Sequence, residues 1–168
     1  MALAALTAET LLGFDTETRP AFRKGQSFTP ALVQLAGATC VYLFQLNRVP
    51  FDDALAGLLA NPGIVKAGVA VRDDIKALQA LTDFEPGGFL DLGDQARDLG
   101  LRTNGLRNLS ANFLGFRISK GAQRSNWDTA TLTPKQVNYA ATDAWVSREL
   151  CLRLATLGLV DLPRPGDT

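Results

Sequence analysis

Apolar residues follow two spacings along this chain, short continuous runs at first and helical intervals later. Runs over residues 11–14, 31–36 and 40–46 predict three strands, with a Gly-Ala-Thr turn between the second and the third. A fourth run, over residues 64–71, is typical of a buried strand because valine and isoleucine recur along it. The first run passes directly into an acidic segment, Asp-Thr-Glu, at residues 15–17.

Helical spacing and capping signals predict four further elements, over residues 52–61, 73–81, 106–114 and 133–158. The first begins with two aspartates and ends at an Asn-Pro-Gly turn, and the last begins with a capping Thr133 followed by proline. This order of elements predicts an α/β protein with a mixed sheet flanked by helices. No repeat or linker divides the chain, so we expect a single domain over residues 1–168.

The composition fits an ordinary folded domain but excludes many kinds of active site. The chain has 168 residues, of which 46% are apolar, and 17 basic side chains balance 17 acidic ones. It has no histidine, which excludes Ser-His-Asp and Cys-His nucleophiles, histidine general bases and zinc sites that need imidazole. Catalysis must therefore use carboxylates, Tyr, Lys, Ser, Thr, Cys or a metal ion held by oxygen.

The cysteines and the N-terminal segment bear on the compartment. Cys40 and Cys151 are too few for a thiolate zinc site or a disulfide framework, so we expect two small buried side chains in a reducing environment. The first twelve residues carry no Lys or Arg, which argues against a signal peptide, and no apolar run approaches the roughly 20 residues of a membrane span. We expect a soluble cytoplasmic protein without membrane contact.

Two pairs of polar residues have spacings that place each pair on one face of its element. Asp15 and Glu17 are two positions apart on a strand, and Tyr139 and Asp143 are four positions apart on the last helix. Asp74 lies where a strand leads into a helix. Taken singly, these residues also suit a solvated strand end, a half-buried tyrosine with a surface aspartate, and a helix cap. Taken together, the carboxylates would repel one another unless cations neutralise them, and such oxygen ligands suit Mg²⁺ or Mn²⁺.

Three motifs in this chain resemble those of a known enzyme family. Residues 13–18 (Gly-Phe-Asp-Thr-Glu-Thr), 68–74 (Gly-Val-Ala-Val-Arg-Asp-Asp) and 139–144 (Tyr-Ala-Ala-Thr-Asp-Ala) are similar, in that order, to the motifs of the DEDD exonucleases. The likeness covers about residues 11–152 and is greatest to the tyrosine subgroup, which includes ribonuclease D and Werner-type exonuclease domains. The resemblance implies a ribonuclease H-like fold and removal of nucleotides from a nucleic-acid 3′ end with two divalent cations.

The family pattern also implies roles for individual residues. Asp15 would bridge both ions, and Tyr139 would hydrogen-bond the attacking water and help to orient or deprotonate it. In the second motif, Asp73 is the alternative to Asp74. We favour Asp74 because a bulky residue, Ile75, follows it, as is usual in the family. The metal ligands implied by the resemblance are Asp15, Glu17, Asp74 and Asp143.

Substrate contacts are predicted from residues beside these motifs. Thr16 and Thr18 are placed to touch the terminal nucleotide, and Lys24, next to Arg23, and Arg124 are placed to follow phosphates. Trp127 is a candidate for stacking on a base, with packing of its loop onto the body as the alternative. We expect three other cationic side chains to lie on a solvent-exposed face: Arg102, Arg107 and Lys120. The alternative is that they contact nucleic acid.

Together these inferences predict a free-standing 3′→5′ exonuclease that depends on Mg²⁺ or Mn²⁺ and releases nucleoside 5′-monophosphates. DNA is the expected substrate, because the first motif and Ser-Asn-Trp at residues 125–127 look more like Werner-type domains than ribonuclease D. Trimming of RNA 3′ ends is the alternative within the same chemistry. A catalytically retired nucleic-acid-binding scaffold is the alternative outside it, although a retired site would have no reason to keep four mutually repelling carboxylates.

The zero net charge does not argue against a nucleic-acid partner. Without the four proposed ligands, 17 basic side chains face 13 acidic ones. Two divalent cations would cancel the charge of the four carboxylates, so the metal-loaded form would carry the positive charge that attracts phosphates.

Overall fold

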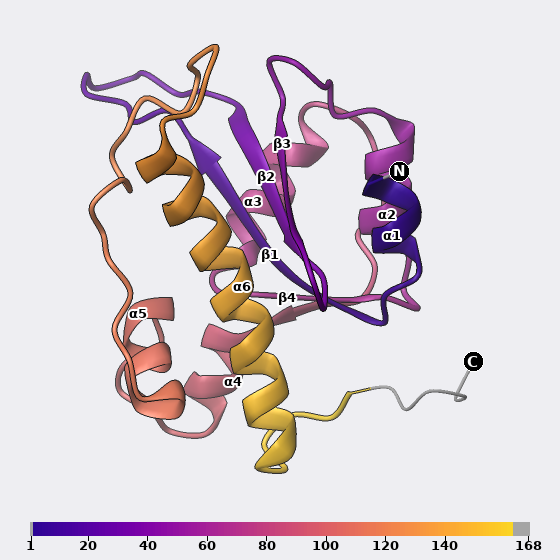
Figure 1. The fold of residues 1–168 in the computed structure, drawn as a ribbon, viewed down its shortest axis with the longest axis vertical. Helices are drawn as coiled ribbons and strands as arrows, with labels where there is room; N and C mark the ends of the chain where they lie inside the picture. The colour runs from indigo at the N-terminus through magenta and orange to yellow at the C-terminus, as the bar shows by residue number, and fades with distance from the viewer. Residues whose placement is uncertain (1, 163–168) are drawn as a thin grey trace.

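A five-stranded sheet forms the centre of the protein, whose computed structural model describes residues 2–162 (Figure 1). The strands lie in the order β3-β2-β1-β4-β5, and β1 pairs antiparallel with β2 and parallel with β4. The mixed sheet predicted from the order of elements is therefore confirmed. The strands are β1 (Leu11–Thr18), β2 (Pro30–Ala36), β3 (Val41–Gln45), β4 (Val65–Gly68) and β5 (Phe89–Asp91).

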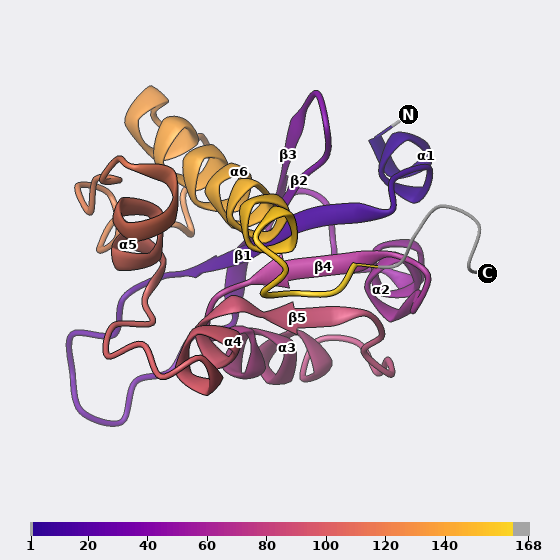
Figure 2. The ribbon, with the colours of Figure 1, turned by 90° about the horizontal axis from the view of Figure 1, so that it is seen from below.

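Helices cover both faces of the sheet (Figure 2). One face packs against α6 (Pro134–Thr156), α4 (Leu92–Asp98) and α5 (Leu106–Leu109), which continues as a π-helical turn, Ser110–Leu114. The other face packs against α1 (Ala2–Thr7), α2 (Asp53–Ala60) and α3 (Val71–Gln79). Each set of helices buries its own hydrophobic cluster against the sheet. Within residues 2–162, no helix has the length and apolar character needed to cross a membrane.

Strand β1 supplies side chains to both layers because successive residues of a strand point to opposite faces. Leu12 and Phe14 belong to the cluster beneath α1, α2 and α3, whereas Leu11 belongs to the cluster beneath α6. Asp15 and Glu17 are even numbers of positions from Leu11 and therefore lie on the α6 face. Because β1 extends to Thr18, both carboxylates are held within the strand and not beyond its end.

The predicted helices are present, and their ends follow the signals in the sequence. Asp52 caps α2 by accepting a hydrogen bond from the Leu55 N–H. Thr133 and Gln136 cap α6 reciprocally, with Pro134 in the first turn. The predicted helix over residues 106–114 is α5 together with the π-helical turn.

Two structural expectations are wrong. The strand expected over residues 64–71 ends at Gly68, because Ala70 has a left-handed φ of 58° and Val71 already begins α3. Cys40 is exposed instead of buried, since it lies in the turn before β3, whereas Cys151 is buried as expected. The short elements α1, β5 and α4 span too few residues to show a periodic pattern, and the sequence does not predict them.

The contact between α6 and β1 is close enough to require glycine. A Cβ atom at Gly13 would lie 1.9 Å from the carbonyl oxygen of Ala144 and 2.9 Å from the backbone nitrogen of Arg148. Both obstacles are backbone atoms of α6, which cannot move aside unless the whole helix moves. This contact therefore fixes the height of α6 above the strand that carries the acidic segment.

Replacing Gly13 with alanine should lower the free energy of unfolding by about 3 kcal/mol or more, since the added methyl group overpacks the contact. Gly57, in α2, provides a matched control because a Cβ there would meet nothing within 4 Å. Gly57→Ala should raise the free energy of unfolding by about 0.5–1 kcal/mol. Urea unfolding of the three proteins measures both effects, and an unchanged stability of Gly13→Ala would contradict the prediction.

Candidate active site

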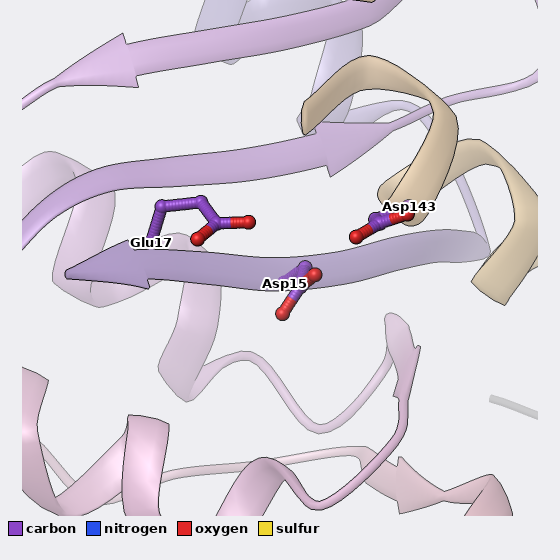
Figure 3. A group of neighbouring side chains, drawn as sticks. All are labelled: Asp15, Glu17 and Asp143. Carbon is purple, nitrogen blue, oxygen red and sulfur yellow. The ribbon is translucent and has the colours of Figure 1, made fainter. Parts of the chain in front are cut away.

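Three carboxylates from β1 and α6 meet on the face of the sheet that α6 covers (Figure 3). One carboxylate oxygen each of Asp15, Glu17 and Asp143 lies within 4.8 Å of the others. Glu17 and Asp143 are buried, and Oδ1 of Asp143 has no hydrogen-bond partner among the described residues. Burying a carboxylate oxygen without a hydrogen-bond donor costs free energy, so we expect this oxygen of Asp143 to bind a proton or a cation.

Asp74 approaches the same end of β1 from the opposite layer. It lies in the first turn of α3, and its Oδ1 accepts a hydrogen bond from the Thr16 hydroxyl. Thr16 alternates with Asp15 and Glu17 along β1, so it faces the α3 layer. Asp74 is not one of the three mutually close carboxylates, but its charge raises the pKa of both Asp15 and Glu17. Asp73 is exposed and exerts no such effect on them, so of the two aspartates Asp74 is the one beside the site.

The start of α3 is fixed by Asp91, a residue that no pattern in the sequence indicated. The carboxylate of Asp91 accepts hydrogen bonds from the N–H groups of Ala70 at 3.1 Å and Val71 at 3.0 Å, and it also caps α4. Ala70 is the one non-glycine residue with positive φ in the described chain, and this conformation costs about 1–2 kcal/mol for an alanine. The hydrogen bonds to Asp91 stabilise this turn, so α3 begins where Asp74 can reach Thr16.

Loss of solvation raises the pKa of all four carboxyl groups and is the largest cause at each. It raises the pKa of Glu17 to about 9, with repulsion from Asp15, Asp143 and Asp74 adding to the shift. The pKa of Asp15 lies well above its usual range for the same reasons. The pKa values of Asp74 and Asp143 are both raised to about 6. At neutral pH the cluster therefore attracts protons or cations more strongly than isolated carboxylates would.

Tyr139 lies one helical turn before Asp143 on the same face of α6. Burial, followed by the negative charges of Asp143 and Glu17, raises the pKa of its phenol well above the ordinary value. Its ring packs against Trp127, with ring centroids 5.9 Å apart. The hydroxyl therefore stays protonated at neutral pH and is held in place as a hydrogen-bond donor.

A cleft of about 620 Å³ opens beside these side chains, within the size range of ligand-binding pockets. One side is formed by β1 and α6 and includes the three carboxylates and Tyr139. The facing side comes from residues 105–123 and carries three exposed cations, Arg107, Arg117 and Lys120. An anionic side that attracts cations and a cationic side that attracts phosphates together suit a phosphate-bearing ligand with bound metal ions.

The residues predicted to contact substrate lie in three different places: in the cleft, outside it and in the core. Thr16 lines the cleft, whereas Thr18, Lys24 and Arg124 do not. Trp127 is fully buried and packs between β2 and α6, so the expectation that it stacks on a base is wrong. The alternative, that its ring packs the loop onto the body, is confirmed.

Several polar residues of the cleft were not predicted. Arg117, Asn108 and Gln123 line it, as do Arg107 and Lys120, for which a solvated face was the expectation. One signal in the sequence could have found them, since residues 99–127 contain no Asp or Glu at all. A basic segment that follows two acidic motifs is a candidate for the opposite wall of a phosphate-binding cleft.

Comparisons of the sequence and of the structure with known proteins find relatives of one kind. The sequence profile of a family described as 3′-5′ exonuclease matches residues 1–158. The mouse bifunctional 3′-5′ exonuclease/ATP-dependent helicase WRN is 32% identical over 154 residues, which cover 88% of this chain and 11% of that protein. Ribonuclease D of Haemophilus influenzae is 31% identical over 140 residues, which cover 82% of this chain and 34% of that enzyme. The crystal structure of the Aedes aegypti Nibbler EXO domain is 26% identical and matches with a TM-score of 0.82, over 96% of this chain and 85% of that one.

The chain thus spans about a tenth of the length of the mouse helicase and about a third of the length of ribonuclease D. The structural match confirms the expected ribonuclease H-like fold, a mixed sheet flanked by helices. Since the family profile covers nearly the whole chain, the protein belongs to the 3′-5′ exonuclease family, the DEDD exonucleases that its three motifs indicated.

Proposed function

We propose that this chain is a metal-dependent 3′→5′ exonuclease that hydrolyses the terminal phosphodiester bond of a nucleic acid and releases a nucleoside 5′-monophosphate. The observation that carries the proposal is the group of three carboxylates within 4.8 Å of one another, beside a cleft with a cationic wall. Membership of the exonuclease family supports the same activity. We also propose that residues 1–168 form one exonuclease domain and that it acts in the cytoplasm, a reducing compartment that suits its two free cysteines.

The acidic cluster fits divalent cations by the chemistry of its donors. Every candidate ligand atom is a carboxylate oxygen, the donor that Mg²⁺ and Mn²⁺ prefer, and the buried Oδ1 of Asp143 has no other partner within residues 2–162. When bound, the ions would lower the pKa of the attacking water and neutralise charge on the leaving oxygen. We propose that two ions would be held by Asp15, Glu17, Asp74 and Asp143.

The other side chains of the site would position the reactants. In the proposed hydrolysis, a water oxygen bonds to the terminal phosphorus, the bond from phosphorus to the 3′ oxygen of the preceding nucleotide breaks, and that oxygen takes a proton. The raised pKa of Tyr139 supports a role as a donor that orients the water, and argues against a role as a base. The Thr16 hydroxyl would hold Asp74, and the cations of the facing wall would pair with phosphate oxygens.

DNA is the proposed polymer, on the likeness of the first motif to Werner-type domains. RNA is the second candidate, favoured by the match to ribonuclease D at 31% identity. Hydrolysis of DNA and of RNA needs the same chemistry, so the preferred polymer is identified by comparing the rates on both substrates in one digestion series. Single-stranded DNA, recessed duplex DNA and single-stranded RNA of the same sequence should be compared at equal concentration, and the substrate with the highest kcat/KM identifies the polymer.

Removal of one proposed ligand should abolish strand shortening. Asp15→Asn and Asp143→Asn should lower kcat about 100-fold or more, since the metal site contributes several kcal/mol to the barrier. Tyr139→Phe should lower kcat about 100-fold through loss of the orienting hydroxyl. A strand labelled at its 5′ end, incubated with Mg²⁺, Mn²⁺ or EDTA and resolved on a gel, measures these rates.

The neighbouring aspartates of the second motif provide the matched control. Asp74→Asn should behave like Asp15→Asn, whereas Asp73→Asn should keep the wild-type rate because Asp73 is exposed and outside the cluster. Activity that survives EDTA, or an Asp15→Asn protein as active as wild type, would refute the proposed mechanism. Strand binding without shortening under any condition would favour the scaffold alternative.

The stability of the metal-free protein should fall as the pH rises. The pKa of Glu17 is about 9 in the folded state and 4.5 in its ordinary state, so the folded state binds more protons within this window. Relative to Glu17→Gln, which cannot ionise, the wild type should therefore lose about 3 °C or more in Tm between pH 5 and pH 9 in EDTA. Mg²⁺ or Mn²⁺ should raise Tm more at pH 8 than at pH 5.5, because protons compete with the ions. If the Tm of the wild type minus the Tm of Glu17→Gln stays constant or increases between pH 5 and pH 9, the raised pKa of Glu17 is contradicted.

A further inference from the structure

The loop between β1 and β2, residues 19–29, forms an exposed surface outside the cleft. The side chains of Arg19, Arg23 and Lys24 are exposed, and none of the loop residues is acidic. Arg124, from the segment that precedes α6, lies against the same loop. None of these cations forms an ion pair among the described residues. They are therefore free to pair with an external anion.

Two aromatic rings alternate with these cations. Phe22 is 72% exposed, and the guanidinium carbon of Arg124 lies 5.8 Å from the centre of its ring. The guanidinium carbon of Arg19 lies 5.0 Å from the centre of the Phe28 ring. Such contacts orient the rings and guanidinium groups while leaving much of Phe22 uncovered. An aromatic face held among cations is the composition of surfaces that bind single-stranded nucleic acid, where bases stack on rings and phosphates pair with cations.

Charge is unevenly distributed around this surface. Residues 18–51 and 99–127 contain no Asp or Glu, so the loop and the cationic wall of the cleft belong to two wholly basic stretches of the chain. The residues between them, 52–98, carry most of the acidic side chains outside the site and form α2, α3 and α4. An approaching polyanion is therefore attracted to the cationic wall of the cleft and to the loop, despite the zero net charge.

The surface adjoins the cleft through both of its segments. The loop begins at Arg19, two residues after Glu17, a separation of roughly 7 Å along an extended chain. Arg124 directly follows Gln123, which lines the cleft. Figure 1 shows the segment after the π-helical turn passing beside α6 and reaching the β1–β2 loop near the start of that helix. A strand with its 3′ end in the cleft can leave across this surface.

We propose that this surface binds the single-stranded nucleic acid on the 5′ side of the nucleotides held in the cleft. A base would stack on Phe22, and the flanking phosphates would pair with the cations. The inference rests on the proposed function, because it takes the 3′ end of the strand to lie in the cleft. We call the surface the basic–aromatic patch; its residues are Arg19, Phe22, Arg23, Lys24, Phe28 and Arg124.

Equilibrium binding tests the patch without catalysis. Strands labelled at the 5′ end, of about 4 and about 16 nucleotides, are titrated in EDTA with wild type, Phe22→Ala and the double variant Arg23→Ala/Lys24→Ala. Only the longer strand reaches from the cleft across the patch. Phe22→Ala should raise the Kd of the longer strand about fivefold or more, with a change below about twofold for the shorter one. A plot of log K against log salt has a negative slope, and the double variant should reduce the magnitude of this slope by about 1.4, or 0.7 for each lost phosphate contact.

Arg153→Ala is the control for loss of a surface cation elsewhere on the protein, since this exposed arginine lies in the last turn of α6, away from the patch. It should leave both affinities unchanged. Thermal melting shows whether each variant is folded. Affinities for the longer strand within twofold of wild type in both patch variants, or equal losses for the two lengths, would overturn the inference. A wild-type protein that binds long strands through the patch but shortens none would instead refute the proposed exonuclease function.

Discussion

The direct contact of helix α6 with strand β1 at Gly13 is the constraint on which the rest of the structure depends. With no side chain between them, the helix backbone lies against the strand, and a Cβ would meet the Ala144 carbonyl at 1.9 Å. Asp143 comes one residue before Ala144, so the same contact sets the height of its carboxylate above Asp15 and Glu17. A helix held farther away by a larger residue at this position would keep all four carboxylates in the sequence and lose the cluster.

Bringing these buried carboxylates together costs electrostatic free energy, which the rest of the structure must offset. Burial raises the pKa of Glu17 to about 9 and of Asp143 to about 6, so both groups resist ionisation. The turn at Ala70, stabilised by Asp91, adds a fourth carboxylate from the opposite layer. A break in register between Glu17 and Thr18 ends the regular pairing of β1 with β2 beside the cluster, a common place for β-bulges. The fold holds these charges together because strong packing elsewhere offsets their repulsion, and cations would turn that repulsion into binding energy.

The uneven distribution of charge explains how a neutral protein can bind a polyanion. The acidic side chains lie mainly in the site and in residues 52–98, whereas the charged side chains of the cleft wall and of the β1–β2 loop are all basic. At physiological ionic strength, charges farther apart than about 8 Å are largely screened, so an incoming strand responds to the surface it meets and not to the total charge. The overall charge therefore says little about the partner, and the local distribution says much more.

The sequence by itself determined those features of the protein that depend on interactions between residues near one another along the chain. The caps at Asp52 and Thr133 set where α2 and α6 begin, because capping involves only neighbouring residues. The spacings of Asp15 with Glu17 and of Tyr139 with Asp143 put each pair on one face, since strand and helix periods are fixed by the backbone. The three motifs in order then indicated the family. Only the tertiary structure decided the rest: Trp127 is buried, Asp74, which the sequence already favoured over Asp73, lies beside the cluster, and Arg117 faces the carboxylates across the cleft. Each of these depends on residues distant in the sequence, and burial and charge proximity are set by what packs around a side chain, which spacing along the chain does not contain.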